Sequence, residues 1–142
     1  PVARAWARSI AAEMHSGFVP MRSDMTMCIR ERVDVRPWSP DLTTDIERVV
    51  ALWSEARRRF GAGGPYLFGA WSIADAFFAP VAFRFQTYAV EPVDEAGAYW
   101  RRLLSHPHVR EWEGAALAET TVIEVDEPRH IYRDKLQARG RP

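Results

Sequence analysis

The chain has 142 residues, which is enough for one domain with a single hydrophobic core. Its 19 basic and 19 acidic residues give a formal net charge of zero. This balance argues against nucleic acid or an anionic membrane as the main partner, because both attract proteins with a basic excess. The single cysteine, Cys28, excludes an internal disulfide and a cysteine-rich zinc site. We expect a cytoplasmic protein without a metal site or a membrane-spanning segment.

Apolar residues that recur every three or four positions predict a series of helices, and no strand–helix–strand pattern is found. The expected helices span residues 3–28, 41–60, 73–89, 94–104 and 107–118. Pro20 should kink the second half of the first helix. Ser39 and Pro40 are typical of the N-cap and first position of the second helix. The fold class predicted is therefore all-α, a bundle of about five helices.

Residues 73–89 are apolar on nearly every side, so this helix should run through the middle of the bundle. Ser72 and Asp75 stand three residues apart at its start, the spacing of a capping box. We interpret both residues as structural. A Ser/Asp nucleophile is the alternative, but no histidine stands nearby in the sequence and capping explains both side chains.

The last expected helix, 107–118, should bury Val109, Trp112, Ala116 and Leu117. His106 and His108 stand across its start, where a surface turn is favoured over a metal pair. Residues 120–142 show no long period, and we interpret them as a C-terminal extension that follows a domain of residues 1–119.

Three stretches in this order resemble one known family. Residues 12–18, AEMHSGF, are similar to the first helix of the C-terminal domain of bacterial glutathione transferases, including the beta class. Residues 65–69, PYLFG, with the 72–75 capping box, resemble the loop and start of that family's buried central helix. Residues 100–112, with His106-Pro107 between two tryptophans, resemble its last two helices. Ser16 departs from the beta-class pattern, which often has lysine there.

The resemblance implies a glutathione S-transferase C-terminal helical domain that lacks its N-terminal thioredoxin-like domain. We expect that domain to precede Pro1 and to carry the residue that activates the glutathione thiol. The resemblance further implies no covalently bound cofactor, glutathione as the co-substrate of the full-length protein, and a hydrophobic electrophile as the second substrate. The family also implies a homodimer. We expect this chain alone to be inactive.

His15 is the first candidate site residue, because it matches a beta-class histidine that lies near the glutathione sulfur. An imidazole near a thiol stabilises the thiolate. A solvent-facing histidine with only local partners is the structural alternative.

The other candidates for binding glutathione or the second substrate are Met14, Phe18, Arg22 and Arg84. Arg8, His15 and Arg22 recur every seven residues, nearly two helical turns, which predicts one shared cationic face that would attract anionic glutathione. A solvated charged face is the alternative, favoured for Arg8, and a contact across the dimer interface is another for the arginines of this helix. Met14 and Phe18 line either a pocket or the core. Arg84 interrupts an apolar helix, so it should reach a pocket mouth or pair with a carboxylate.

Two rival functions fit the same resemblance. One is a glutathione-dependent isomerase or reductase on this scaffold. Only the active-site residue of the thioredoxin-like domain would distinguish such an enzyme from a transferase. The other is a non-catalytic interaction domain that has lost glutathione binding. Cys28 does not match the family's catalytic cysteine and is expected to be a buried, inert thiol.

Overall fold

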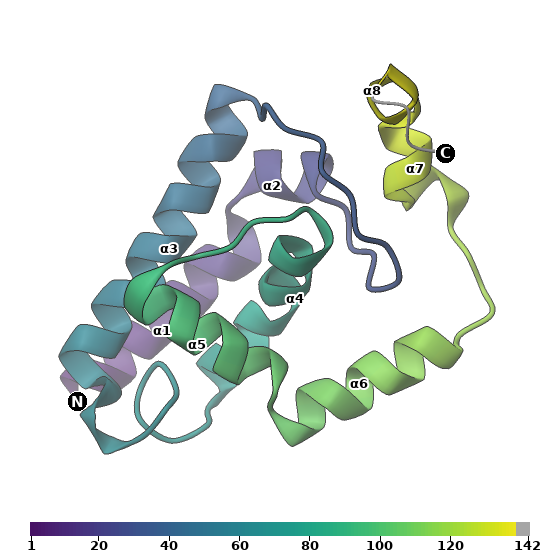
Figure 1. Ribbon diagram of the computed structural model, residues 1–142. Coiled ribbons are helices and arrows are strands. Elements are labelled where there is room, and N and C mark those ends of the chain that lie inside the picture. The colour runs from purple at the N-terminus through teal and green to yellow at the C-terminus, as the bar shows by residue number, and fades with distance from the viewer. Residues whose placement is uncertain (139–142) are drawn as a thin grey trace.

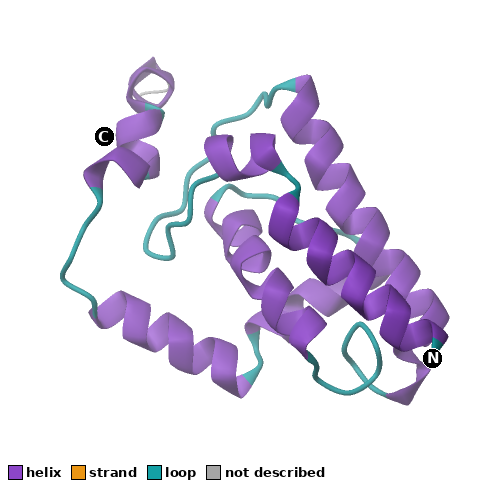
Figure 2. Ribbon diagram, turned by 180° about the vertical axis from the view of Figure 1, so that it is seen from behind, coloured by secondary structure: helices purple, strands orange, loops and turns teal. Residues whose placement is uncertain are grey.

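The computed structural model describes residues 1–138 of the chain, and these residues are all-α, as predicted (Figure 1). The last four residues of the expected 120–142 extension lie outside this range. Five helices have substantial length, and no strand is drawn in the described part of the chain (Figure 2). The α-helices are α1 (Val2–Ser16), α2 (Val19–Asp24), α3 (Pro40–Phe60), α4 (Ile73–Thr87), α5 (Asp94–Leu104), α6 (Pro107–Ala118), α7 (Pro128–Ile131) and α8 (Arg133–Ala138).

The core lies between four of these helices, with α1 packed on α4 and α3 packed on α5 (Figure 1). Trp53 of α3 is completely buried at its centre and contacts the rings of Phe78, Phe85 and Tyr99. Aromatic side chains bury large apolar areas, so this cluster supplies much of the hydrophobic free energy that holds α3, α4 and α5 together.

The predicted helix 3–28 is wrong in its length, because the chain breaks after Ser16 into α1 and α2. Gly17 takes an extended backbone, and Phe18 follows with a left-handed φ of 60°. Pro20 stands in the first turn of α2, where the missing amide proton costs no hydrogen bond. It therefore helps to start a second helix and does not kink the first.

The start of α4 carries the predicted capping box. One carboxylate oxygen of Asp75 accepts from the backbone amide and from the hydroxyl of Ser72, each at 2.8 Å. The other oxygen accepts from the amide of Leu67 and from the hydroxyl of Tyr99, each at 3.1 Å. Asp75 is fully buried, so its carboxylate joins the 65–72 loop, α4 and α5 at one point.

Helix α6 lies at the edge of the molecule, apart from the four packed helices (Figure 1). Val109 is buried as predicted, but Trp112 and Leu117 are 41% and 52% exposed. The prediction that the last helix buries both residues is wrong, because α6 presents a narrower apolar face to the bundle than its periodicity indicates. Glu113 is buried in their place and pairs with Arg110.

The chain leaves α6 in an extended run and returns to the bundle as α7 and α8 (Figures 1 and 2). We call residues 119–138 the C-terminal segment. Its Tyr132 hydroxyl donates to the carbonyl of Asp24 at 2.5 Å, and Arg129 pairs with Glu31 at 3.0 Å. Leu136 is buried in the same core as the bundle. None of the helices in residues 1–138 is long and apolar enough to cross a membrane.

Removal of the Asp75 carboxylate should destabilise the fold more than removal of its capping partner. Ser72→Ala should lower the free energy of unfolding by about 1 kcal/mol, the usual cost of a lost cap. Asp75→Ala should cost about 3 kcal/mol, because it leaves buried donors on both sides of the junction without an acceptor. Urea denaturation measures both, with exposed Glu47→Ala as the control. Equal losses for the three variants would contradict the role of Asp75.

The four tyrosines predict a stability loss at high pH. Burial raises the pKa of Tyr66 and Tyr99, and it raises the pKa of Tyr88 and of Tyr132 to about 12. The unfolded chain releases these protons near pH 10, so the stabilisation is complete below that pH and is lost towards pH 12. Ultraviolet titration should show tyrosine ionisation above pH 10 in the native protein and near pH 10 in urea. Coincident curves would contradict this prediction.

Candidate functional site

His15 lies in the last turn of α1 with its side chain exposed. Its ring meets that of Phe77 on α4 edge to face, with 6.4 Å between the centroids. Phe77 is itself 39% exposed, although most of α4 is buried. The two rings therefore mark an accessible seam between α1 and α4.

Arg22 folds back from α2 onto the end of α1. Its Nη2 donates to the carbonyls of Met14 at 2.5 Å and His15 at 3.1 Å, and its Nε donates to Gly17 at 3.1 Å. The carbonyls at a helix C-terminus have no partners within the helix and carry partial negative charge. The guanidinium thus neutralises the end of α1 and fixes the helix break directly beside His15.

Met14 and Phe18 point their side chains into the hydrophobic core, where they are 4% and 8% exposed. Met14 contributes to the seam only through its carbonyl. Phe18 acts through its left-handed backbone, which turns the chain from α1 into α2.

Arg84 lies near the end of α4 and is partly buried. Its Nε donates to the carbonyl of Met25 at 2.6 Å, and its Nη1 lies 3.4 Å from the carbonyl of Pro80 and 3.7 Å from the sulfur of Met27. Burial lowers the pKa of Arg84, and the nearby positive charge of Arg22 lowers it further. An arginine guanidinium keeps its proton in proteins even where its pKa is lowered, so Arg84 carries a positive charge.

The structure therefore brings three of the five predicted binding residues to one region. Arg22 of α2 bonds to the carbonyl of His15 and its charge acts on Arg84 of α4, whereas the side chains of Met14 and Phe18 face inward. Arg8 is exposed further back on α1. The prediction from the seven-residue spacing assumed one continuous helix. The helix ends at Ser16, but α2 turns back on α1, so the Arg22 guanidinium still bonds to the carbonyl of His15.

Phe77 is the residue of this region that sequence reasoning missed. It stands in a helix that is apolar on nearly every side, so periodicity does not distinguish it from the core residues Phe78 and Phe83. The one available signal is that Phe77 precedes Arg84 by seven residues, which places both on the same side of α4.

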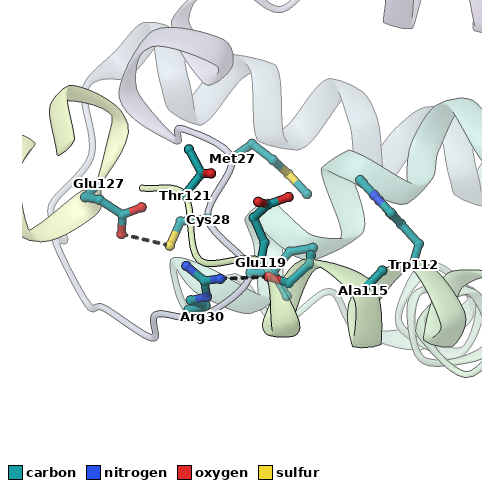
Figure 3. Close-up of a pocket in the computed structure, with 10 residues that line it drawn as sticks. Met27, Cys28, Arg30, Trp112, Ala115, Glu119, Thr121 and Glu127 are labelled. Atoms are coloured by element: carbon teal, nitrogen blue, oxygen red, sulfur yellow. Dashed lines mark hydrogen bonds between the residues drawn. The ribbon is translucent and has the colours of Figure 1, made fainter. Parts of the chain in front are cut away.

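A separate cavity of about 440 Å³ lies between α6, the loop after α2 and the C-terminal segment (Figure 3). Met27, Cys28 and Trp112 line it together with Arg30, Glu119 and other residues. The Cys28 thiol lies 3.4 Å from a carboxylate oxygen of Glu127, and the close-up marks this contact (Figure 3). Burial raises the pKa of the thiol, and the hydrogen bond and negative charge of Glu127 raise it as well.

His106 stacks on Trp71 with ring centroids 3.6 Å apart, and its Nδ1 accepts from the amide of His108. His106 is thus the N-cap of α6. Within residues 1–138, no group of three or more histidine, cysteine or acidic side chains is placed to hold a metal ion.

Comparison with known proteins assigns the fold. The family described as "Glutathione S-transferase, C-terminal domain" matches residues 31–115, more than half of the chain. The chain belongs to this family. The match includes α3, the capped start of α4, α5 and most of α6, and it begins after His15 and Arg22. No curated protein and no solved structure matches the chain.

Cys28 should react slowly with thiol reagents. It is 6% exposed and its pKa is raised, so little thiolate is accessible at pH 8. Reaction with a disulfide reagent should be at least about tenfold slower in the native protein than in urea. Glu127→Gln should speed the native reaction severalfold, whereas Glu119→Gln, a change in the same cavity, should not. Equal rates for the two variants would contradict the influence of Glu127 on the thiol.

Proposed function

We propose that this chain is the helical substrate-pocket domain of a glutathione transferase that conjugates glutathione to hydrophobic electrophiles. The family match supports the helical-domain part of this proposal. The observation that carries the rest is the exposed pair of rings, His15 and Phe77, beside the helix end that Arg22 holds. The charge of Arg22 also acts on Arg84 of α4, so a second guanidinium adds to the positive field near this end.

The chemistry of these groups suits a thiol-conjugating enzyme. Glutathione is anionic, and two guanidinium groups provide a positive field that attracts it. The exposed imidazole of His15 is available to stabilise a thiolate that approaches the end of α1. The carbonyls of that helix end would oppose an anion, but Arg22 already occupies three of them.

In this proposal the residue that activates the thiol belongs to a thioredoxin-like domain. Residues 1–138 contain helices and two isolated bridges but no sheet on which such a domain is built. The mechanism is then divided between two domains. One activates the glutathione thiol, and this one supplies a wall of the pocket against which the electrophile is held. A cytoplasmic homodimer, as the family implies, is part of the same proposal.

The division of activity between domains is tested by an assay with glutathione and a general aromatic electrophile. The chain alone should give no more than the uncatalysed rate, and the full-length protein should be active. His15→Ala in the full-length protein should lower kcat/KM by about tenfold, equivalent to about 1.4 kcal/mol of thiolate stabilisation. His108→Ala removes an exposed histidine of α6 and should have no effect.

Equal activity of the chain and the full-length protein would overturn the division. An unchanged kcat/KM in His15→Ala would remove His15 from the site. If the full-length protein neither turns over the electrophile nor is retained on a glutathione resin, the interaction-domain function is correct instead.

A further inference from the structure

The start of α6 is capped by an imidazole ring. Nδ1 of His106 accepts a hydrogen bond from the backbone amide of His108 at 3.2 Å. A ring nitrogen accepts only while it carries no proton, so this bond requires the neutral form of His106. The side-chain oxygen of the more usual Ser or Asn cap accepts without regard to pH. The cap of α6 therefore depends on pH in a way that an oxygen cap does not.

The ring of His106 also joins α6 to the rest of the bundle. It stacks on Trp71 of the 65–72 loop, with 3.6 Å between the centroids and 12° between the planes. Tyr66 of the same loop meets it edge to face at 5.4 Å. The backbone amide of His106 donates to the carbonyl of Leu103 at the end of α5. His106 is only 9% exposed, so its ring is fixed between this loop and the first turn of α6.

The groups that face the ring determine which protonation state the fold favours. Burial lowers the pKa of His106 and the charge of His108 lowers it further, whereas the Asp75 carboxylate of α4 raises it. The oxygens of Asp75 already accept four hydrogen bonds from other groups. Burial raises the pKa of Tyr66, on which the charge of Arg102 of α5 also acts, so this phenol stays neutral. The neutral ring is therefore the form that suits the folded start of α6.

Protonation of His106 has two unfavourable effects on α6. The new proton on Nδ1 removes the acceptor of the His108 amide, and the new charge stands at the positive end of the helix dipole. An imidazolium stacked on Trp71 gains a cation–π attraction. That attraction holds the ring on the loop, and it does not replace the bond between the ring and the helix.

We propose that His106 is a pH-sensitive cap, whose neutral ring holds the first turn of α6 on the bundle and whose protonation releases that turn. Helix α6 is a wall shared by two spaces, because Trp112 lines both the cavity of Figure 3 and an apolar groove of about 360 Å³ between α4 and α6. The cap thus controls how firmly this shared wall is held. It involves no glutathione and stands independently of the proposed conjugation reaction.

The pH range of the release follows from the direction of the pKa shift. In a released first turn the pKa of His106 is near its ordinary value of 6.5, and in the folded turn it is lower. The released turn therefore binds the proton more readily than the folded one. The stabilisation by the cap is complete above pH 6.5, decreases as the pH falls below that value, and stops decreasing below the folded pKa.

Hydrogen exchange of the α6 amides at about pH 7.5 and about pH 5, corrected for the intrinsic rates, tests the cap. The amides of His108 and Arg110 bond to the Nδ1 and the carbonyl of His106, and their protection should fall about fivefold at the lower pH, the usual effect of a lost cap. His106→Asn keeps a capping oxygen that does not titrate, so its protection should be the same at both pH values. His108→Gln removes the exposed neighbouring histidine and should retain most of the pH dependence.

Equal protection at the two pH values in the unaltered protein would overturn the proposal, as would an undiminished pH dependence in His106→Asn. If His106→Asn fails to fold because it loses the stack on Trp71, the nuclear magnetic resonance titration of His106 in the unaltered protein decides the question. The midpoint of that titration should coincide with the midpoint of the change in α6 exchange, and separate midpoints would exclude His106 as the group responsible.

Discussion

The buried carboxylate of Asp75 is the interaction on which the rest of the architecture depends. It accepts hydrogen bonds from Leu67 in the preceding loop, from Ser72 at the helix start and from Tyr99 on α5. A buried carboxyl group is tolerated only when hydrogen-bond donors surround it, and four donors do so here. Because three separate parts of the chain supply these donors, the carboxylate fixes the position of α4 within the bundle.

The position of α4 in turn determines what the surface of the molecule offers. One side of the helix carries Phe78 and Phe85 into the cluster around Trp53. On its other side, Phe77 contacts the ring of His15, and Pro80 lines a small apolar groove between α4 and α6. Arg84, one turn further along, lies close enough to Arg22 for the two charges to interact. The binding features we propose therefore depend on a helix whose own stability is centred on the opposite face.

The helices predicted most accurately from the sequence are those whose ends carry capping residues. Ser39 accepts from the amide of Leu42 as expected of an N-cap, and α3 and α6 lie within one residue of the predicted bounds. The break at Gly17 has a local cause, since a Cβ there would lie 2.8 Å from the carbonyl oxygen of Glu13, four residues earlier. The failure at Trp112 and Leu117 has a long-range cause, because packing between helices decides which apolar residues of α6 are buried.

The candidate site was predictable only in part, for the same reason. The spacing of His15 and Arg22 indicated a shared region, but it did not reveal that Arg22 is held by the carbonyls at the end of α1. Trp112 has the spacing of a core residue and yet lies exposed on α6, where it lines both the cavity of Figure 3 and an apolar groove between α4 and α6. No periodic pattern distinguishes an apolar side chain that faces a core from one that faces an open groove.

The return of the C-terminal segment has a consequence for the order of folding. Its hydrogen bonds join residues about one hundred positions apart, such as Thr26 with Asp126 and Asp24 with Tyr132. Contacts this distant in sequence have a large loop-closure entropy until the intervening chain is ordered. The bundle shortens that loop, so the segment docks after α1 to α5 have assembled. We therefore expect the loop that carries Cys28, which this segment contacts through Glu127, to be covered late in folding.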